Sequence, residues 1–137
     1  MLLLNPEIVR FESHAWDDVA ALAIDRTPKR IIEEHSDLGP FATFADVPEQ
    51  SIHIRVQRRI TSDDLDASAL GASGTLTFYF SPPGAELSRQ RVQITCVLTS
   101  IRTDLPALKQ ATRTLTFLAT SDGTTNPITI PPAALQD

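Results

Sequence analysis

The chain of 137 residues is 42% hydrophobic and 21% charged, with a formal net charge of −5. This composition is typical of one folded domain, so we expect a single domain over residues 1–137. The acidic balance disfavours tight or sequence-specific nucleic-acid binding, and the apolar runs are too short for a transmembrane helix. The apolar start at residues 1–4 lacks the basic flank and the length of a secretory signal. We therefore expect a protein that is kept in a cytoplasm until it is assembled or released, with no membrane partner.

Short β-strands are predicted in the first third of the chain. Residues 7–12 and 19–24 read as two strands joined by a turn, and residues 30–35 read as a third strand after a break at residues 27–28, which include a proline. Trp16 is expected to plug one edge of the core.

Residues 36–48 are predicted to form a long connection, because turn-forming residues lie at both of its ends. Phe41, Phe44 and Val47 make this segment more apolar than a solvated loop needs to be. Exposed apolar loops on a soluble chain indicate a partner or a docking groove.

Four segments alternate apolar and polar residues with a period of two: residues 52–60, 74–80, 89–101 and 112–120. Successive side chains of a strand point to opposite faces of a sheet, so each segment should bury one face. The expected core residues are Ile54, Val56, Leu76, Phe78, Phe80, Val92, Ile94, Cys96, Leu98, Leu115 and Phe117. The opposite face carries Thr, Gln and Tyr more than Lys or Glu, which suits a surface that meets another subunit or lines a channel.

The remaining segments read as connections and short elements. Residues 61–66 could start a short helix with Ser62 as its N-cap, and residues 103–110 form a second possible helix. Residues 81–88 are the tip of a long hairpin, and residues 128–130 form a last short strand. The sequence therefore predicts a mainly β fold, with antiparallel sheets that form a β-sandwich or partial barrel and one short helix.

No motif in the sequence indicates a catalytic, cofactor or metal site. His14, His35 and His53 lack metal-binding spacing, and the acids at residues 63–66 lack the glycine and distal Glu of a calcium loop. No serine lies in a nucleophile elbow, and the five glycines form no phosphate loop. Cys96, the single cysteine, lies on the apolar phase of its strand and is read as a buried structural thiol. We predict no catalytic residue, no cofactor and no metal site.

Charged side chains gather in small groups instead. Arg55, Arg58 and Arg59 form a basic patch that we expect to pair with acids on a neighbouring strand or subunit. The acidic pairs at residues 17–18 and 33–34 are too isolated to act as a catalytic pair.

Residue groups in a fixed order run along nearly the full length of the chain: NPEIV at 5–9, WDDV at 16–19, IDR at 24–26, EEHSDLGP at 33–40, FADVPEQ at 44–50, GTLTF at 74–78 and RTLTFLATSDGTTNP at 113–127. As an ordered set these groups resemble tail tube proteins of tailed bacteriophages and related phage-like particles. The family packs a helix against its sheets, and this helix is poorly marked here.

The resemblance implies subunits that form a ring, usually a hexamer, in which strands from every subunit close one inner β-barrel. Rings stack into a tube in the virion tail, assembled in the host cytoplasm, through which the genome is ejected. Partners would be copies of the chain and other tail proteins such as sheath, baseplate and terminator proteins. Thr and Gln side chains carry no positive charge that could hold a phosphate group, so DNA would pass without specific binding. The residues expected to face the lumen are Thr75, Thr77, Gln93, Thr95, Thr114 and Thr116.

Two segments suit contacts to the next ring or to a neighbouring subunit, because they are long and carry apolar side chains. They are residues 37–48 and the hairpin tip at residues 81–89. The expected contact residues are Phe41, Phe44, Asp46, Pro82, Pro83 and Glu86.

Two alternatives remain open from the sequence. One is a tube-end or baseplate protein that uses the same fold to cap the stack. The other is a soluble β-sandwich binding module, whose binding face should expose aromatic side chains, whereas the single Trp and Tyr of this chain, Trp16 and Tyr79, fall in predicted strands. Enzymatic activity has no positive support in the sequence. The size of the purified protein would separate a monomeric module from rings or polymers.

Overall fold

The computed structural model describes residues 2–4, 7–12, 14–16, 18–60, 70–80, 90–107 and 110–130. Within these ranges every regular element is a β-strand: β1 (Leu2–Leu4), β2 (Glu7–Phe11), β3 (His14–Trp16), β4 (Val19–His35), β5 (Ala42–Arg59), β6 (Ser73–Phe80), β7 (Gln90–Asp104), β8 (Thr112–Ala119) and β9 (Ile128–Thr129). No helix long and apolar enough to cross a membrane is found in the described ranges.

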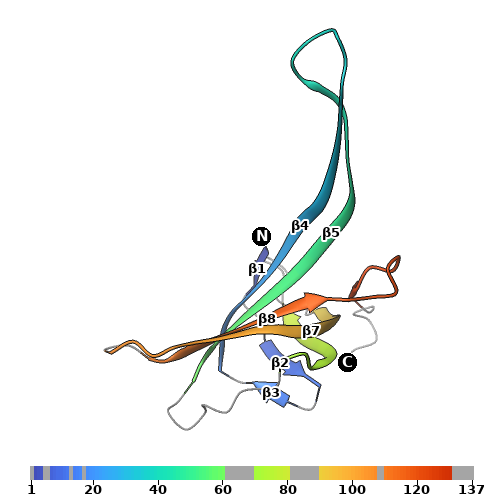
Figure 1. The fold of residues 1–137 in the computed structure, drawn as a ribbon. Helices are drawn as coiled ribbons and strands as arrows, with labels where there is room; N and C mark the ends of the chain where they lie inside the picture. Colours follow the sequence, from blue (N-terminus) through green and yellow to red (C-terminus); the bar gives the residue numbers. More distant parts are fainter. Residues whose placement is uncertain are drawn as a thin grey trace.

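All nine strands belong to one antiparallel sheet (Figure 1). Eight of them follow the order β1-β4-β5-β8-β7-β6-β2-β3, and β9 pairs with Gln93 and Ile94 of β7. The mainly β, antiparallel prediction is confirmed. The sequence led us to expect more than one sheet, whereas the strand pairing here is continuous from β1 to β3. The two end strands do not pair with each other, so the sheet is open.

The sheet curls so that distant strands pack on each other. The rings of Phe11 on β2 and Phe117 on β8 lie 4.9 Å apart between centroids, although β6 and β7 separate these strands in the sheet. Neighbouring strands lie about 4.8 Å apart, so in a flat sheet the two strands would be roughly 14 Å apart. Curling lets one face of a single sheet enclose its own core.

The core is built from the apolar phase of the alternating strands. It contains Val9, Phe11, Leu22, Ile24, Ile52, Ile54, Val56, Leu76, Phe78, Val92, Ile94, Cys96, Leu98, Leu115 and Phe117. Every core residue expected from residues 54–117 is buried, except that Phe80 is partly buried and packs against the cluster. The period-two pattern therefore identified the buried face correctly, because a strand with one solvated face repeats every second residue.

The β4–β5 hairpin leaves the body and extends into solvent (Figure 1). Its inner part joins the core through Leu22, Ile24 and Ile54, which are buried. Farther out, every residue from Arg26 to Gln50 is exposed except the half-buried Ile32. We call residues 26–50 the arm.

Two sequence predictions for the arm are wrong. The strand break at residues 27–28 does not occur, because β4 continues through Pro28, which pairs with Gln50. Beyond Ile24 the outer edge of β4 has no strand partner among the described residues, and a proline is tolerated at such an edge. A register shift between Pro28 and Arg30 follows directly.

The long connection predicted at residues 36–48 is the second error. Ala42 to Pro48 belong to β5, and the tip spans residues 36–41. The register moves from Arg30–Glu49 to Ile32–Asp46, so β5 has one more residue than β4 in this interval. Pro48 lies in that bulge, where a missing backbone N–H breaks no ladder hydrogen bond. Pairing with β4 therefore makes residues 42–48 a strand, although the sequence there contains turn-forming residues.

Only one of the two predicted helices can be compared with the structure. The helix at residues 61–66 and the hairpin tip at residues 81–89 lie outside the described residues. The helix at residues 103–110 is wrong where it is described, because Thr103 and Asp104 extend β7 and pair with β8. Strand β3 replaces part of the turn expected after β2, and Trp16 on β3 stacks on Phe11 at 6.5 Å between ring centroids.

Replacing Phe117 with Ala should lower the free energy of unfolding by about 3–5 kcal/mol, because the ring is fully buried and its loss leaves a cavity. Urea denaturation followed by circular dichroism measures this change. Phe41→Ala is the matched control: its ring is 83% exposed, so the same substitution should change stability by less than about 0.5 kcal/mol. Equal effects at both positions would contradict the curled core.

Candidate functional site

Titratable side chains do not gather into a metal-binding cluster in the part of the chain that the structure describes. No group of three or more His, Cys, Asp or Glu residues there is placed to hold a metal ion. His14 lies on β3, His35 ends β4 at the tip of the arm, and His53 lies on β5 beside the body. Three features stand out as candidates: the polar face of the sheet, the arm and a cavity at the base of the arm.

Two arginines of the basic patch, Arg55 and Arg58, pair with acids of the same chain. Arg58 donates to both carboxylate oxygens of Asp18, from Nε at 2.9 Å and from NH2 at 3.0 Å, and its guanidinium lies 5.2 Å from the centroid of the Trp16 ring. Arg55 pairs with Asp25 on the neighbouring strand β4. The predicted pairing with an acid on a neighbouring strand is confirmed for Arg55; the partner of Arg58, Asp18, directly precedes β4.

The six residues predicted to face a lumen lie on the sheet face opposite the core, because each alternates with buried neighbours. Thr75 pairs with Thr95, and Thr77 pairs with Gln93, across β6 and β7. Thr114 and Thr116 lie on β8, where Thr116 pairs with Arg55 of β5. The sequence missed that arginines share this face: Arg55 is next to Thr116, and Arg10 is next to Thr77.

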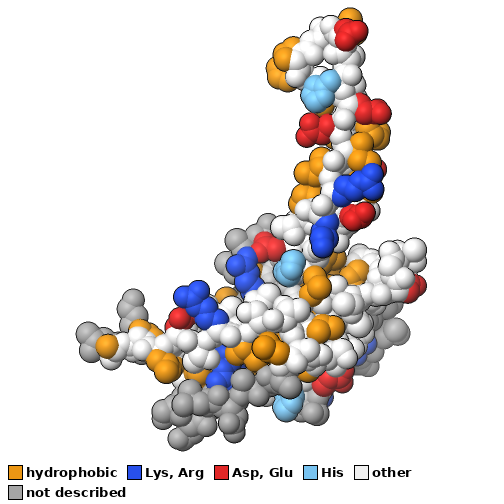
Figure 2. Space-filling view, in the orientation of Figure 1, with side chains coloured by type: hydrophobic (Ala, Val, Ile, Leu, Met, Phe, Trp, Pro, Cys, Tyr) orange, Lys and Arg blue, Asp and Glu red, His pale blue; other side chains and the backbone are white. Residues whose placement is uncertain are grey.

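The arm carries the contact residues that the structure describes. Phe41 lies at the tip, whereas Phe44 and Asp46 lie on β5, opposite Glu34 and Ile32 respectively. Pro82, Pro83 and Glu86 lie outside the described residues. Large apolar side chains are exposed along the arm (Figure 2): Ile31 at 55%, Leu38 at 96%, Phe41 at 83%, Phe44 at 50% and Val47 at 46%.

Both edges of the arm are bare within the described residues. Strand β1 pairs with β4 only from Leu22 to Ile24, and β8 pairs with β5 only from His53 to Arg59. Farther out, each strand of the arm pairs only with the other. Such edges present unpaired backbone N–H and C=O groups, which can pair with another chain.

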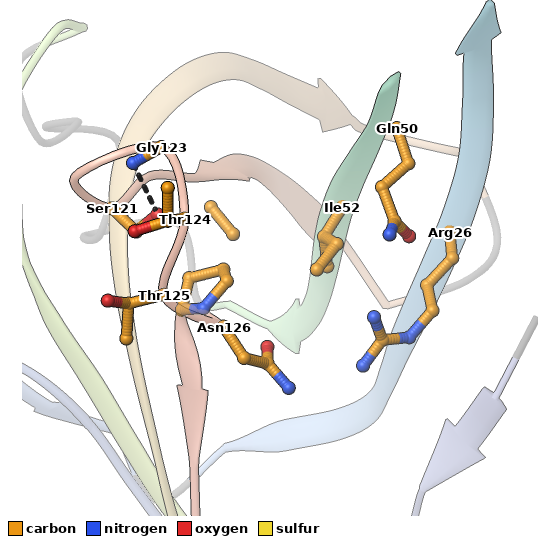
Figure 3. Close-up of a pocket in the computed structure, with 10 residues that line it drawn as sticks. Arg26, Gln50, Ile52, Ser121, Gly123, Thr124, Thr125 and Asn126 are labelled. Atoms are coloured by element: carbon orange, nitrogen blue, oxygen red, sulfur yellow. Dashed lines mark hydrogen bonds between the residues drawn. The ribbon is translucent and has the colours of Figure 1, made fainter. Parts of the chain in front are cut away.

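A cavity of about 470 Å³ lies at the base of the arm (Figure 3). It was missed by the sequence reasoning, because its walls come from distant segments. Strands β4 and β5 supply Arg26, Gln50 and Ile52, and the turn after β8 supplies most of the rest. The lining residues are Arg26, Gln50, Ile52, Ala119, Ser121, Gly123, Thr124, Thr125, Asn126 and Pro127. In the sequence, the cavity is indicated by nothing more than the polar run at residues 121–126, which is typical of a turn.

Asp122 shapes the wall of this cavity from outside it. Its Oδ1 accepts hydrogen bonds from the backbone N–H groups of Thr124, at 2.9 Å, and Thr125, at 2.8 Å. Both threonine hydroxyls also bind the carboxylate. The backbone bonds from Thr125 and then Thr124 are the main reason that the pKa of Asp122 is lowered to about 2. Gly123, at a φ of +104°, supplies the left-handed backbone that the turn needs.

A scan against protein-family models and a search of curated proteins find no match for this chain. The function has to be argued from the arm, the polar face and the cavity.

The amide signals of Thr124 and Thr125 should titrate with a midpoint near pH 2, instead of the 3.8 of a free Asp. Because the folded pKa is lowered, the turn is fully stabilised above pH 3.8 and loses that stabilisation as the pH falls toward 2. Two-dimensional NMR across this range measures the midpoint. The Asp122→Asn variant should abolish the titration, and a wild-type midpoint at 3.8 would show that the carboxylate does not hold the turn.

Cys96 should be unreactive in the folded protein. Burial raises the pKa of its thiol from 9.0 to about 12, and the reactive species is the thiolate. Because the folded pKa is raised, the native state is favoured fully below pH 9.0 and loses this contribution as the pH rises toward 12. Ellman's reagent should label the thiol only when guanidinium chloride is added. Rapid labelling without denaturant would contradict its burial.

Proposed function

We propose that this chain is a structural subunit of a phage or phage-like tail tube. Copies form rings, hexameric by the resemblance, and the rings stack around a channel for genome ejection. The protein belongs to the virion tail after assembly in the host cytoplasm, and it contributes no catalysis. Its partners are other copies of the chain and the tail proteins at the ends and around the tube.

The arm is the observation that carries this proposal. A two-stranded hairpin alone is marginally stable in water, yet this one extends well beyond the core with both edges bare. Leu38 and Phe41 at its tip are almost fully exposed. A projecting element of this kind gains stability when a neighbouring molecule covers its apolar side chains and edges.

The open sheet supports closure between copies. Strands β1 and β3 end the sheet, and each pairs on one side only among the described residues. Joining such sheets around an axis into one barrel removes free edges. The proposed inner barrel is therefore a physical solution to the edges that a single subunit leaves open.

The polar face supports the assignment of a channel lining. Thr75, Thr77, Gln93 and Thr95 form adjacent pairs across β6 and β7, and neutral hydroxyl and amide groups offer phosphate no fixed positive charge. Arg55 and Arg10 also lie on this face. Arg55 pairs with Asp25, which limits its attraction for DNA, whereas Arg10 is exposed and would attract phosphate without sequence preference. DNA would therefore slide along this surface without specific binding.

The double variant Phe41→Ser, Phe44→Ser should fold but should not form long tubes. Fully burying one exposed large apolar side chain contributes about 1.5–3 kcal/mol. Phe41 is 83% exposed and Phe44 is 50% exposed, so the two substitutions should weaken each contact by about 2–4 kcal/mol. Negative-stain electron microscopy measures tube length, and circular dichroism checks the fold. Leu70→Ser, Leu105→Ser is the matched control, because it removes two exposed apolar side chains, 64% and 65% exposed, outside the arm.

Two outcomes would contradict the proposal. Tubes of normal length in the phenylalanine variant would show that the arm tip is not a contact. A wild-type protein that stays monomeric at high concentration would favour the binding module. A single ring per particle would instead identify a tube-end protein of the same fold.

A further inference from the structure

We propose that the cavity at the base of the arm receives the arm tip of a second copy, with the Asp37 carboxylate bound by the Arg26 guanidinium. This inference rests on the proposed function, because both require copies of the chain to associate. It adds the surface that the tip contacts, which the tube assignment leaves undefined.

The cavity is chemically suited to a carboxylate. The Arg26 guanidinium makes no ion pair or hydrogen bond to any described residue, and it lies with the Gln50 amide on the same side of the cavity (Figure 3). Asn126 accepts the Ile128 N–H through Oδ1 at 3.0 Å, which leaves its NH₂ group as a donor. No Asp or Glu occurs among the described lining residues. A planar guanidinium beside amide donors matches the two oxygens of a carboxylate.

The cavity also has an apolar part. Ile52, Ala119 and Pro127 line it beside the polar donors. A ligand that fills this space should therefore carry an apolar group next to its carboxylate. Free inorganic anions would use the guanidinium alone and leave the apolar wall in water.

The arm tip has this combination of groups. Asp37 is followed by Leu38, which is 96% exposed, and Phe41 is 83% exposed. Ser36 Oγ accepts the Leu38 N–H at 3.2 Å and fixes the turn around Asp37. Residues 31–48 contain four acids and no Lys or Arg, so the outer arm is complementary in charge to a cavity lined by one arginine and no acid.

The tip cannot reach the cavity of its own molecule. β4 and β5 pair from the body to His35 and Ala42, which keeps the arm extended. At about 3.3 Å per residue, Asp37 lies roughly 35 Å along the arm from Arg26. An arm tip bound in this cavity must therefore belong to a second copy. A contact between the tip of one copy and the base of the next is heterologous, and such contacts close into rings or continue as open filaments.

A charge exchange between Arg26 and Asp37 tests the inference. Each of the single variants Arg26→Glu and Asp37→Arg should raise the critical concentration for assembly by about tenfold, and the double variant should return it to within about threefold of the wild type. Sedimentation of assembled protein over a concentration series measures this value. Circular dichroism and thermal melting confirm that each variant folds.

Arg30→Glu is the matched control, because it makes the same charge change on the same strand outside the cavity lining. Arg30 lies roughly 13 Å from Arg26 along the strand, beyond the Debye length of about 8 Å at physiological salt. Its pair with Glu49 is 3.8 Å long and exposed, and such a pair contributes little. This variant should assemble at the wild-type concentration.

The outcomes separate this inference from the tube assignment. Wild-type assembly by Arg26→Glu would overturn the cavity contact and leave the tube proposal standing. Two defective single variants without rescue in the double variant would overturn the Arg26–Asp37 pairing. Loss of assembly by Arg30→Glu to the same extent would show a general charge effect and overturn it as well. A wild-type chain that never assembles would overturn both proposals.

Discussion

The pairing of β4 with β5 is the constraint on which the rest of the structure depends. One end of this ladder is fixed in the core by Leu22, Ile24 and Ile54, and the other end continues into solvent to His35 and Ala42. Because the same two strands serve both regions, the orientation of the arm is set by the packing of the body. The pairing that links the tip to the body contains register shifts between Pro28 and Ile32 and again between Glu34 and His35.

The curl of the sheet is the second feature that determines how the body is packed. It brings Phe11 against Phe117 and encloses the apolar faces, so the polar face lies on the outside of the body. The cation–π contact of Arg58 with Trp16 and its ion pair with Asp18 join β5 to β3 and to the residue that precedes β4. The body can thus be well packed even though hydrogen bonds do not close it.

Period-two alternation predicted ten of the fifteen described core residues, because burial of one sheet face imposes that pattern on each strand. It left out Val9, Phe11, Leu22, Ile24 and Ile52. It could not predict the arm, where both faces are exposed and no alternation is required. There the sequence showed prolines and turn formers at residues 27–28 and 36–48, and these were read as breaks. Only pairing between segments distant in the chain reveals that Pro28 and Pro48 lie at an edge and in a bulge. The cavity was unpredictable for a related reason, since Arg26 and Asn126 meet only through the fold.

The two prolines of the arm, Pro28 and Pro48, have a consequence for aggregation. A bare β-edge is a template for uncontrolled strand addition and fibril growth. Pro28 and Pro48 each remove a donor from the outer strands near the point where the arm leaves the body, and charged side chains such as Lys29 and Glu49 flank them. These prolines and charged residues interrupt each edge, which disfavours uncontrolled strand addition by other chains.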